Sequence, residues 1–104
     1  MKKLYEEYKE ILKEKAEENR KEKIKNQFSG WDGSHYSLVR LVKQNMHDDS
    51  SFEHVETRFK DMGEYVFVIM KFRGNNAFGA KIINVVTANV SLDNKILSYT
   101  YLEQ

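Results

Sequence analysis

The spacing of hydrophobic residues along the chain predicts a long helix first, a short helix next, and strands in the remainder. Residues 3–26 contain no glycine or proline and consist mainly of residues that favour a helix, such as lysine, glutamate, leucine and alanine. In the first half of this segment apolar residues recur at helical spacing, whereas in residues 13–23 only Ala16 is apolar. The stripe consists of Leu4, Tyr5, Tyr8, Ile11 and Leu12. We therefore expect a charged N-terminal helix whose second half is solvated.

The segment NQFSGWDGSHYSL, which begins at Asn26, separates this helix from a second one. Gly30 and Gly33 break the helical pattern, and Asp32 or Ser34 is available as the next N-cap. A second helix then runs over about residues 34–46. One side of it carries His35, Leu38, Val39, Val42 and Met46.

The rest of the chain predicts four strands joined by short connections. Alternating apolar residues indicate strands over 52–60, 64–73, 79–92 and 95–102. The connections are DMG, GNNAF and the pair Asp93-Asn94, which are short enough to place each strand beside the next. The predicted fold class is therefore α+β, with a four-stranded antiparallel meander. The expected domains are a charged helix over residues 1–26 and a helix-plus-sheet domain over 27–104.

The predicted loop lengths set a register, and the register assigns the two faces of the sheet. The expected partners are Val90–Leu97, Ala88–Tyr99 and Val86–Tyr101 in the last hairpin, Phe59–Tyr65, Thr57–Phe67 and Val55–Ile69 in the first, and Phe67–Val86 and Val68–Val85 between them. One face should then pack on the second helix through Val55, Phe59, Tyr65, Phe67, Ile69, Val86, Ala88, Val90, Leu97, Tyr99 and Tyr101. The second face has an apolar centre of Val66, Val68, Met70, Phe72, Ile83 and Val85.

This second face is the predicted binding surface, because an apolar patch of that size should be covered. The covering element is the N-terminal helix, a second copy of the chain or a foreign protein. His54, Glu56 and Arg58 form a row at its border, spaced by roughly 7 Å, which suits a line of contacts better than a proton relay. A solvated edge strand is the alternative interpretation of this row. The predicted partner-binding residues are His54, Glu56, Arg58, Val66, Val68, Met70, Arg73, Asn76 and Phe78.

The amino-acid composition limits the kinds of functional site that this chain can form. The chain has 104 residues, a formal net charge of +1 and no cysteine, so disulfides and cysteine nucleophiles are excluded. No histidines and aspartates have a recognised metal-ligand spacing, and no nucleophile lies at a plausible spacing from a base, so we predict no metal, no cofactor, no catalytic residue and no enzyme. Neither the segment 1–26 nor the segment 27–104 carries the clustered basic charge that nucleic-acid binding requires. No segment has the pattern of a signal peptide or membrane span, so we expect a cytoplasmic protein without a membrane partner.

Three blocks of the sequence, in this order, resemble a family of small bacterial and prophage proteins. The blocks are QFSGWDGSHYSL, SFEHVETRF and FRGNNAFGAKIINVVTANVSLD. The resemblance covers about residues 27–97 and implies no activity. In some family members the domain follows a membrane segment, which this chain lacks, so the resemblance favours a stand-alone cytoplasmic form. The family's motif positions fall on Trp31, Asp32, Gly33, Ser34, His35, Glu56, Arg58, Arg73, Asn76 and Phe78.

Two functional hypotheses follow. The first is a non-enzymatic protein-interaction module, in one form a phage-encoded or mobile-element-encoded inhibitor that blocks the surface of a host defence complex. The alternative is a small-ligand-binding or envelope-associated sensor domain, which a cavity lined by Tyr65, Tyr99 and Tyr101 would favour.

Overall fold

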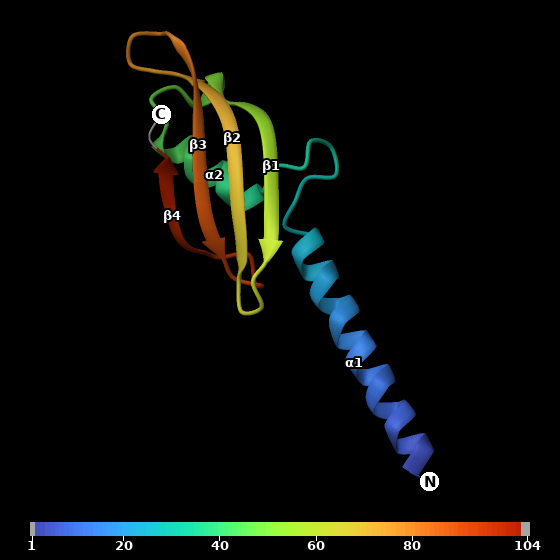
Figure 1. Ribbon diagram of the computed structural model, residues 1–104. Helices are drawn as coiled ribbons and strands as arrows, with labels where there is room; N and C mark the ends of the chain where they lie inside the picture. Colours follow the sequence, from blue (N-terminus) through green and yellow to red (C-terminus); the bar gives the residue numbers. More distant parts are fainter. Residues whose placement is uncertain (1, 103–104) are drawn as a thin grey trace.

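The computed structural model describes residues 2–102 as two helices, a short 3₁₀ turn and four strands (Figure 1). Their order confirms the predicted α+β fold class. The elements are α1 (Lys2–Lys25), α2 (Tyr36–Asn45), the 3₁₀ turn η1 (Asp49–Ser51), β1 (Glu53–Asp61), β2 (Val66–Asn75), β3 (Lys81–Val90) and β4 (Ile96–Leu102).

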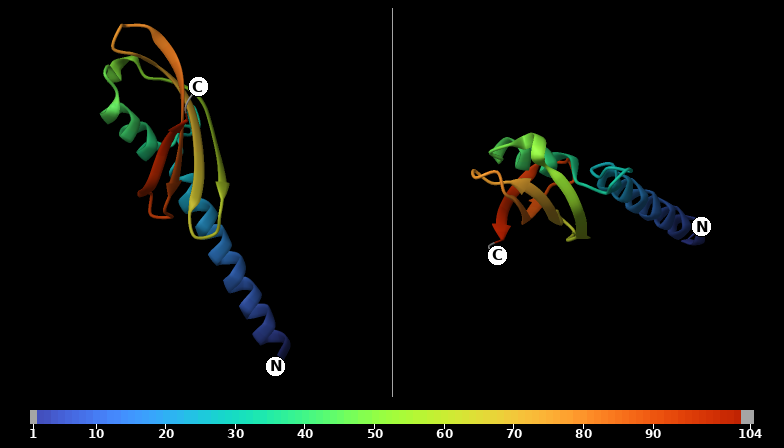
Figure 2. Two further views of the ribbon diagram at one scale, coloured as in Figure 1. Left: turned by 60° about the vertical axis from the view of Figure 1, so that its left-hand side comes forward. Right: turned by 90° about the horizontal axis from the view of Figure 1, so that it is seen from above.

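The strands form one antiparallel sheet in the order β1-β2-β3-β4, and α2 lies across one of its faces (Figures 1 and 2). We call the face that α2 covers the inner face and the opposite one the outer face. α2 buries Leu38 and Val42 against the inner face, because its apolar side and that of the sheet can leave water only together. The strand residues buried in this core are Val66, Val68, Met70, Phe72, Val86, Ala88 and Val90.

The structure corrects the predicted assignment of the faces of β2. Val66, Val68 and Met70, which were expected on an uncovered face, are fully buried in the core beneath α2. Phe67 and Ile69, which were expected in the core, alternate with them and therefore lie on the outer face. The β2 residues of the predicted patch thus belong to the core, whereas Ile83 and Val85 of β3 lie on the outer face.

The cause is a shift in register on both sides of β2. Val86 pairs with Met70 rather than with Phe67, which is a shift of three residues, and the pairing of β1 with β2 is shifted by the same amount. Because side chains alternate between faces with a period of two, an odd shift exchanges the faces of the strand.

Two side chains hold the loops that produce this shift. Asn76 Oδ1 accepts hydrogen bonds from the Phe78 and Ala80 N–H groups at 2.9 and 3.0 Å, which closes a five-residue connection between β2 and β3. Asp61 Oδ1 accepts one from the Gly63 N–H at 2.9 Å within the four-residue connection between β1 and β2. Gly63 has a φ of 97°, in the left-handed region that glycine adopts readily.

The last hairpin follows the predicted register over most of its length. Ala88 pairs with Tyr99, as predicted. Near the turn Val90 pairs with Ile96 instead of Leu97, and a bulge at Leu97 restores the predicted alignment further along β4.

α1 projects away from the body and covers neither face of the sheet (Figures 1 and 2). Only its C-terminal end is attached: Ile24 is buried in the core, and Arg20 binds the Asp61 carboxylate, with an Nε to Oδ2 distance of 2.9 Å. The predicted apolar stripe is exposed along the free part of the helix, through Leu4, Tyr5, Tyr8, Ile11 and Leu12. In this arrangement α1 is therefore not the element that covers the sheet.

Candidate functional site

Three of the predicted partner-binding residues have a different role. Val66, Val68 and Met70 have no exposed surface, so they cannot contact a partner in the folded chain. An aspartate at Val68 or Met70 would place a carboxylate among hydrocarbon side chains, and we expect it to prevent folding rather than to weaken binding.

The predicted row of His54, Glu56 and Arg58 is divided by a β-bulge. The register of β1 shifts between His54 and Glu56, so the side chains on either side of the bulge point to opposite faces. His54 is largely buried and its Nε2 lies 2.7 Å from the Thr57 hydroxyl. Glu56 and Arg58 lie on the outer face and form an ion pair at 2.7 Å. The row is therefore not one line of contacts.

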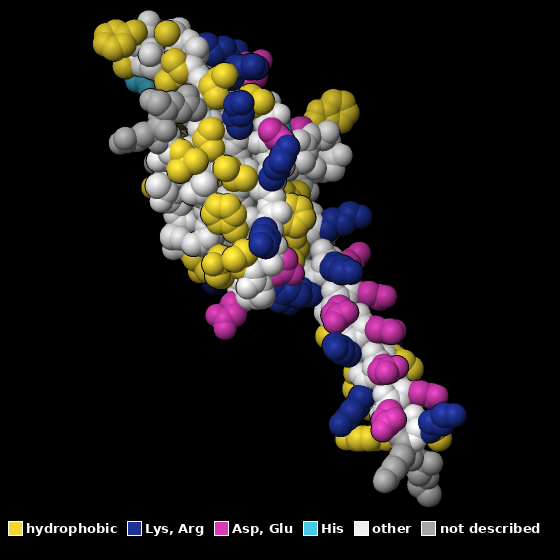
Figure 3. Space-filling view, in the orientation of Figure 1, with side chains coloured by type: hydrophobic (Ala, Val, Ile, Leu, Met, Phe, Trp, Pro, Cys, Tyr) yellow, Lys and Arg dark blue, Asp and Glu magenta, His cyan; other side chains and the backbone are white. Residues whose placement is uncertain are grey.

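The outer face has an apolar strip at its centre. Phe67 and Ile69 alternate along β2, Val85 of β3 lies diagonally to Ile69 as the ladder partner of Lys71, and all three are partly exposed. In the space-filling view hydrophobic side chains gather over the front of the sheet, with lysine and arginine side chains along the β1 and β2 side (Figure 3). No described element crosses this face (Figure 2).

The strip is bordered by positive charge. In the observed register, cationic side chains of the first three strands share the outer face with two carboxylates, Glu53 and Glu56, which leaves a surplus of three positive charges. Glu53 is paired with Lys81, and that pairing lowers its pKa. The outer-face cations are Arg58, Lys60, Lys71, Arg73 and Lys81. Lys60, Lys71 and Arg73 form no direct ion pair within the described chain.

The connection between β2 and β3 presents an aromatic ring. Phe78 is 95% exposed, although the backbone around it is held by the Asn76 side chain. The predicted residues Arg73, Asn76 and Phe78 therefore occupy one end of the sheet: Arg73 on the outer face, Asn76 as the brace of the loop, and Phe78 at its tip. The Asn76 side chain therefore stabilises this turn.

A second exposed aromatic ring sits in the turn between α1 and α2. Trp31 is 95% exposed, and its backbone N–H donates to the Ser29 hydroxyl at 3.1 Å. Asp32 accepts hydrogen bonds from the Ser34 hydroxyl at 2.6 Å and the Ser34 N–H at 2.9 Å, and these bonds lower its pKa. Asp32 also lies 3.7 Å from His54 Nδ1, which links the turn to β1. These hydrogen bonds stabilise the turn that presents Trp31.

His35 begins α2 from inside the protein and is its N-cap, so the prediction of Asp32 or Ser34 was wrong. Its Nδ1 accepts the Leu38 N–H at 3.1 Å, and its Nε2 lies 2.8 Å from Gln27 Oε1. The Gln27 amide in turn donates to the Ser91 carbonyl at 3.0 Å. Full burial lowers the His35 pKa to about 4, so the ring is neutral at neutral pH. This histidine links the turn after α1, the start of α2 and the turn of the last hairpin, and both of its ring nitrogens are engaged.

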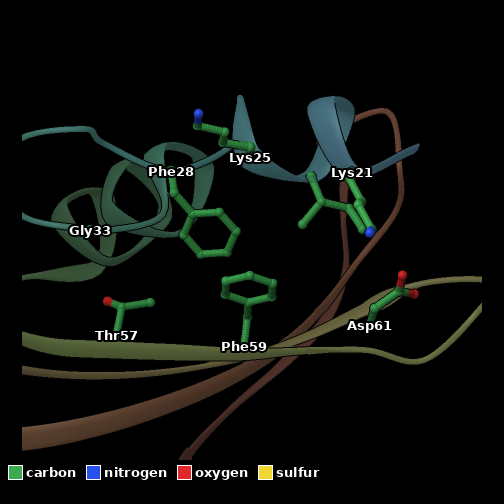
Figure 4. Close-up of a pocket in the computed structure, with 8 residues that line it drawn as sticks. Lys21, Lys25, Phe28, Gly33, Thr57, Phe59 and Asp61 are labelled. Atoms are coloured by element: carbon green, nitrogen blue, oxygen red, sulfur yellow. The ribbon is translucent and has the colours of Figure 1, made fainter. Parts of the chain in front are cut away.

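A groove of about 590 Å³ lies between the end of α1, the following turn and β1 (Figure 4). Its walls are mostly hydrocarbon, and the Phe28 and Phe59 rings stack inside it with centroids 4.6 Å apart. The full lining is Lys21, Ile24, Lys25, Phe28, Gly33, Thr57, Phe59 and Asp61. It is not the predicted tyrosine cavity, because Tyr65 lies in the β1–β2 loop while Tyr99 and Tyr101 lie on β4, at the far edge of the sheet.

Two further searches concern residues 2–102 only. No group of three or more His, Cys, Asp or Glu side chains there is placed to hold a metal ion. None of the helices there has both the length and the apolar character to cross a membrane.

Sequence reasoning missed Phe67, Ile69, Lys60 and Lys71 as surface candidates. Only the register identifies them, since β2 is apolar on both faces. Comparisons of the chain with protein-family models, with curated proteins and with solved structures found no match.

Proposed function

We propose that this protein is a non-enzymatic protein-interaction module whose outer sheet face binds an acidic surface of another protein. One observation carries the proposal: a partly exposed apolar strip with three surplus positive charges around it lies on a rigid sheet and is left open by the described chain. Apolar contact would supply affinity at the centre, and the cations would set orientation and association rate.

The resemblance to bacterial and prophage proteins suggests one form of this function. The bound protein would belong to a host defence complex, and inhibition would follow from covering a surface that the complex needs. Arg58, beside Ile69 on β1, and Arg73, further along β2, would pair with carboxylates of that surface.

The experiment is affinity capture from a bacterial lysate with the wild-type chain and matched variants. Ile69→Asp and Lys71→Glu change the strip and its border, whereas Lys9→Glu makes the same charge change on the projecting helix. We expect the same proteins to be captured by the wild type and Lys9→Glu, and to be lost with both outer-face variants.

Capture should also weaken as salt rises, because the cations are exposed. Urea unfolding of each variant checks that the sheet is intact. Proteins retained equally by Ile69→Asp and Lys71→Glu would refute the outer face as the binding surface.

A second candidate function is the binding of a small apolar ligand in the groove beside β1. The specific observation in its favour is the hydrocarbon lining around Phe28 and Phe59, with the Lys21 and Lys25 ammonium groups available for an anionic end. Titration with a medium-chain fatty acid should shift the NMR signals of the residues that line the groove, such as Phe28 and Thr57. Phe59→Asp should abolish the shift, and an unchanged shift would refute this site.

A further inference from the structure

The two edge strands of the sheet differ in how they are protected against pairing with another strand. β1 carries charged side chains along its whole length, contains a bulge, and faces the turn that follows α1. These are the features by which native proteins block an exposed edge. β4, with the sequence ILSYTYL, contains no charged residue.

β4 also presents apolar surface at its free edge. Leu97, Tyr99, Tyr101 and Leu102 are 60%, 44%, 38% and 46% exposed. No described element lies beside the free edge of β4, and α1 leaves the molecule at the opposite edge of the sheet (Figure 1). An uncharged apolar strand with an unpaired row of backbone groups is a template for a further strand.

We propose that β4 pairs with β4 of a second copy of this chain, antiparallel and about a two-fold axis at Thr100. The pairing extends the sheet through both copies and keeps both α2 helices on the same face. In this register, residues that lie opposite each other have numbers that are both odd or both even, so inner-face residues meet inner-face residues. It does not depend on the partner proposed for the outer face.

The strand is self-complementary under this symmetry. Tyr99 of one copy lies opposite Tyr101 of the other on the inner face, which brings four tyrosine rings together around the axis. Thr100 lies opposite its own equivalent on the outer face. Because the strand has no charge, no like charges meet, and a second copy is favoured over a partner with a charged edge.

The size of the contact sets its strength. A seven-residue strand is about 24 Å long, and its exposed side chains and backbone offer on the order of 400 Å² per copy. The pair therefore buries about 800 Å² in total, which lies in the range of weak, reversible associations. We expect monomer at about 1 μM and mostly dimer at about 500 μM, since a contact of this size saturates only well above micromolar concentration.

The test is analytical ultracentrifugation of the full chain over that concentration range. The wild type should approach twice the 12.3 kDa mass of one chain, whereas Thr100→Lys should remain a monomer because two lysines then oppose each other at the axis. Tyr99→Lys tests the same edge if the axis lies one residue away. Thr87→Lys is the matched control, because Thr87 lies on the same face and is the ladder partner of Thr100 on the interior strand β3.

Far-UV circular dichroism and urea unfolding at low concentration check that each variant folds. A wild-type chain that stays monomeric at about 500 μM overturns the proposal. So does a dimer that survives both β4 substitutions but is lost with Tyr8→Lys, which assigns association to the exposed stripe of α1, or with Ile69→Lys, which assigns it to the outer face.

Discussion

Val68→Thr and Val85→Thr place the same hydroxyl group on opposite faces of neighbouring strands. Threonine has nearly the shape and the strand preference of valine, so the change in stability reports mainly on the hydroxyl. Val68 is fully buried on the inner face, among hydrocarbon side chains of β2, β3 and α2. Val85 lies on the outer face and is partly exposed, so a hydroxyl there reaches water.

The expected magnitudes differ clearly. A hydroxyl buried without a hydrogen-bond partner costs about 1–3 kcal/mol in protein mutational data, whereas a surface change of this kind stays within about 0.5 kcal/mol. In a domain of this size 1 kcal/mol corresponds to about 4–8 °C in Tm. Val68→Thr should therefore lower Tm by at least about 4 °C, and Val85→Thr by less than that.

Urea unfolding followed by far-UV circular dichroism measures both variants, and an unchanged m-value confirms that the comparison concerns stability alone. In the register derived from loop lengths, Val68 and Val85 lie opposite each other on one face and would respond equally. Equal destabilisation, or a larger effect for Val85→Thr, would refute the inner-face assignment of β2.

Three further predictions follow. Stability should fall by up to about 3 kcal/mol as pH drops from about 6.5 to 4, because His35 has a pKa of about 4 when folded and an ordinary value of 6.5 when unfolded, so the unfolded chain binds more protons in this window. His35→Asn keeps an N-cap acceptor and should remove this part of the slope in urea midpoints at pH 7, 5.5 and 4.5; an unchanged slope would assign it to other groups. Arg20→Gln should broaden the distribution of distances between spin labels on α1 and β3 without moving the unfolding midpoint, because the bond to Asp61 orients an exposed helix; an unchanged distribution would show that other contacts orient it. Asn76→Ala should accelerate amide exchange in the β2–β3 connection around Phe78 while leaving β3 protected, and unchanged exchange would show that the loop does not need its side-chain brace.

The candidate surface was only partly predictable. The turn around Asn76 and Phe78 was predictable, because glycine and asparagine mark a turn whatever the register, and a role of Arg73, Asn76 and Phe78 in binding stays a prediction. The row of His54, Glu56 and Arg58 was not, since it assumed strict alternation and a single extra residue in β1 sends His54 to the other side. A bulge leaves no reliable signal in one sequence.

The sequence by itself determined the elements and their order. Helix-forming residues without glycine specify α1, turn residues separate the strands, and the apolar alternation of β3 and β4 aligns Ala88 with Tyr99. β3 and β4 each have one apolar and one more polar face, so a slip between them would expose apolar side chains. The pattern therefore has one favourable solution.

Only the tertiary structure decided which face of β2 became the core. Residues 66–70 of this strand are apolar at every position, so alternation alone expresses no preference between Val68 and Ile69. The choice was made by two loops braced by side-chain hydrogen bonds, and by α2, which packs Leu38 and Val42 against one side. The two faces of β2 are similarly hydrophobic, so hydrophobicity cannot decide which of them is buried. Packing decides it, because the fit between β2 and its neighbouring elements depends on their position in space.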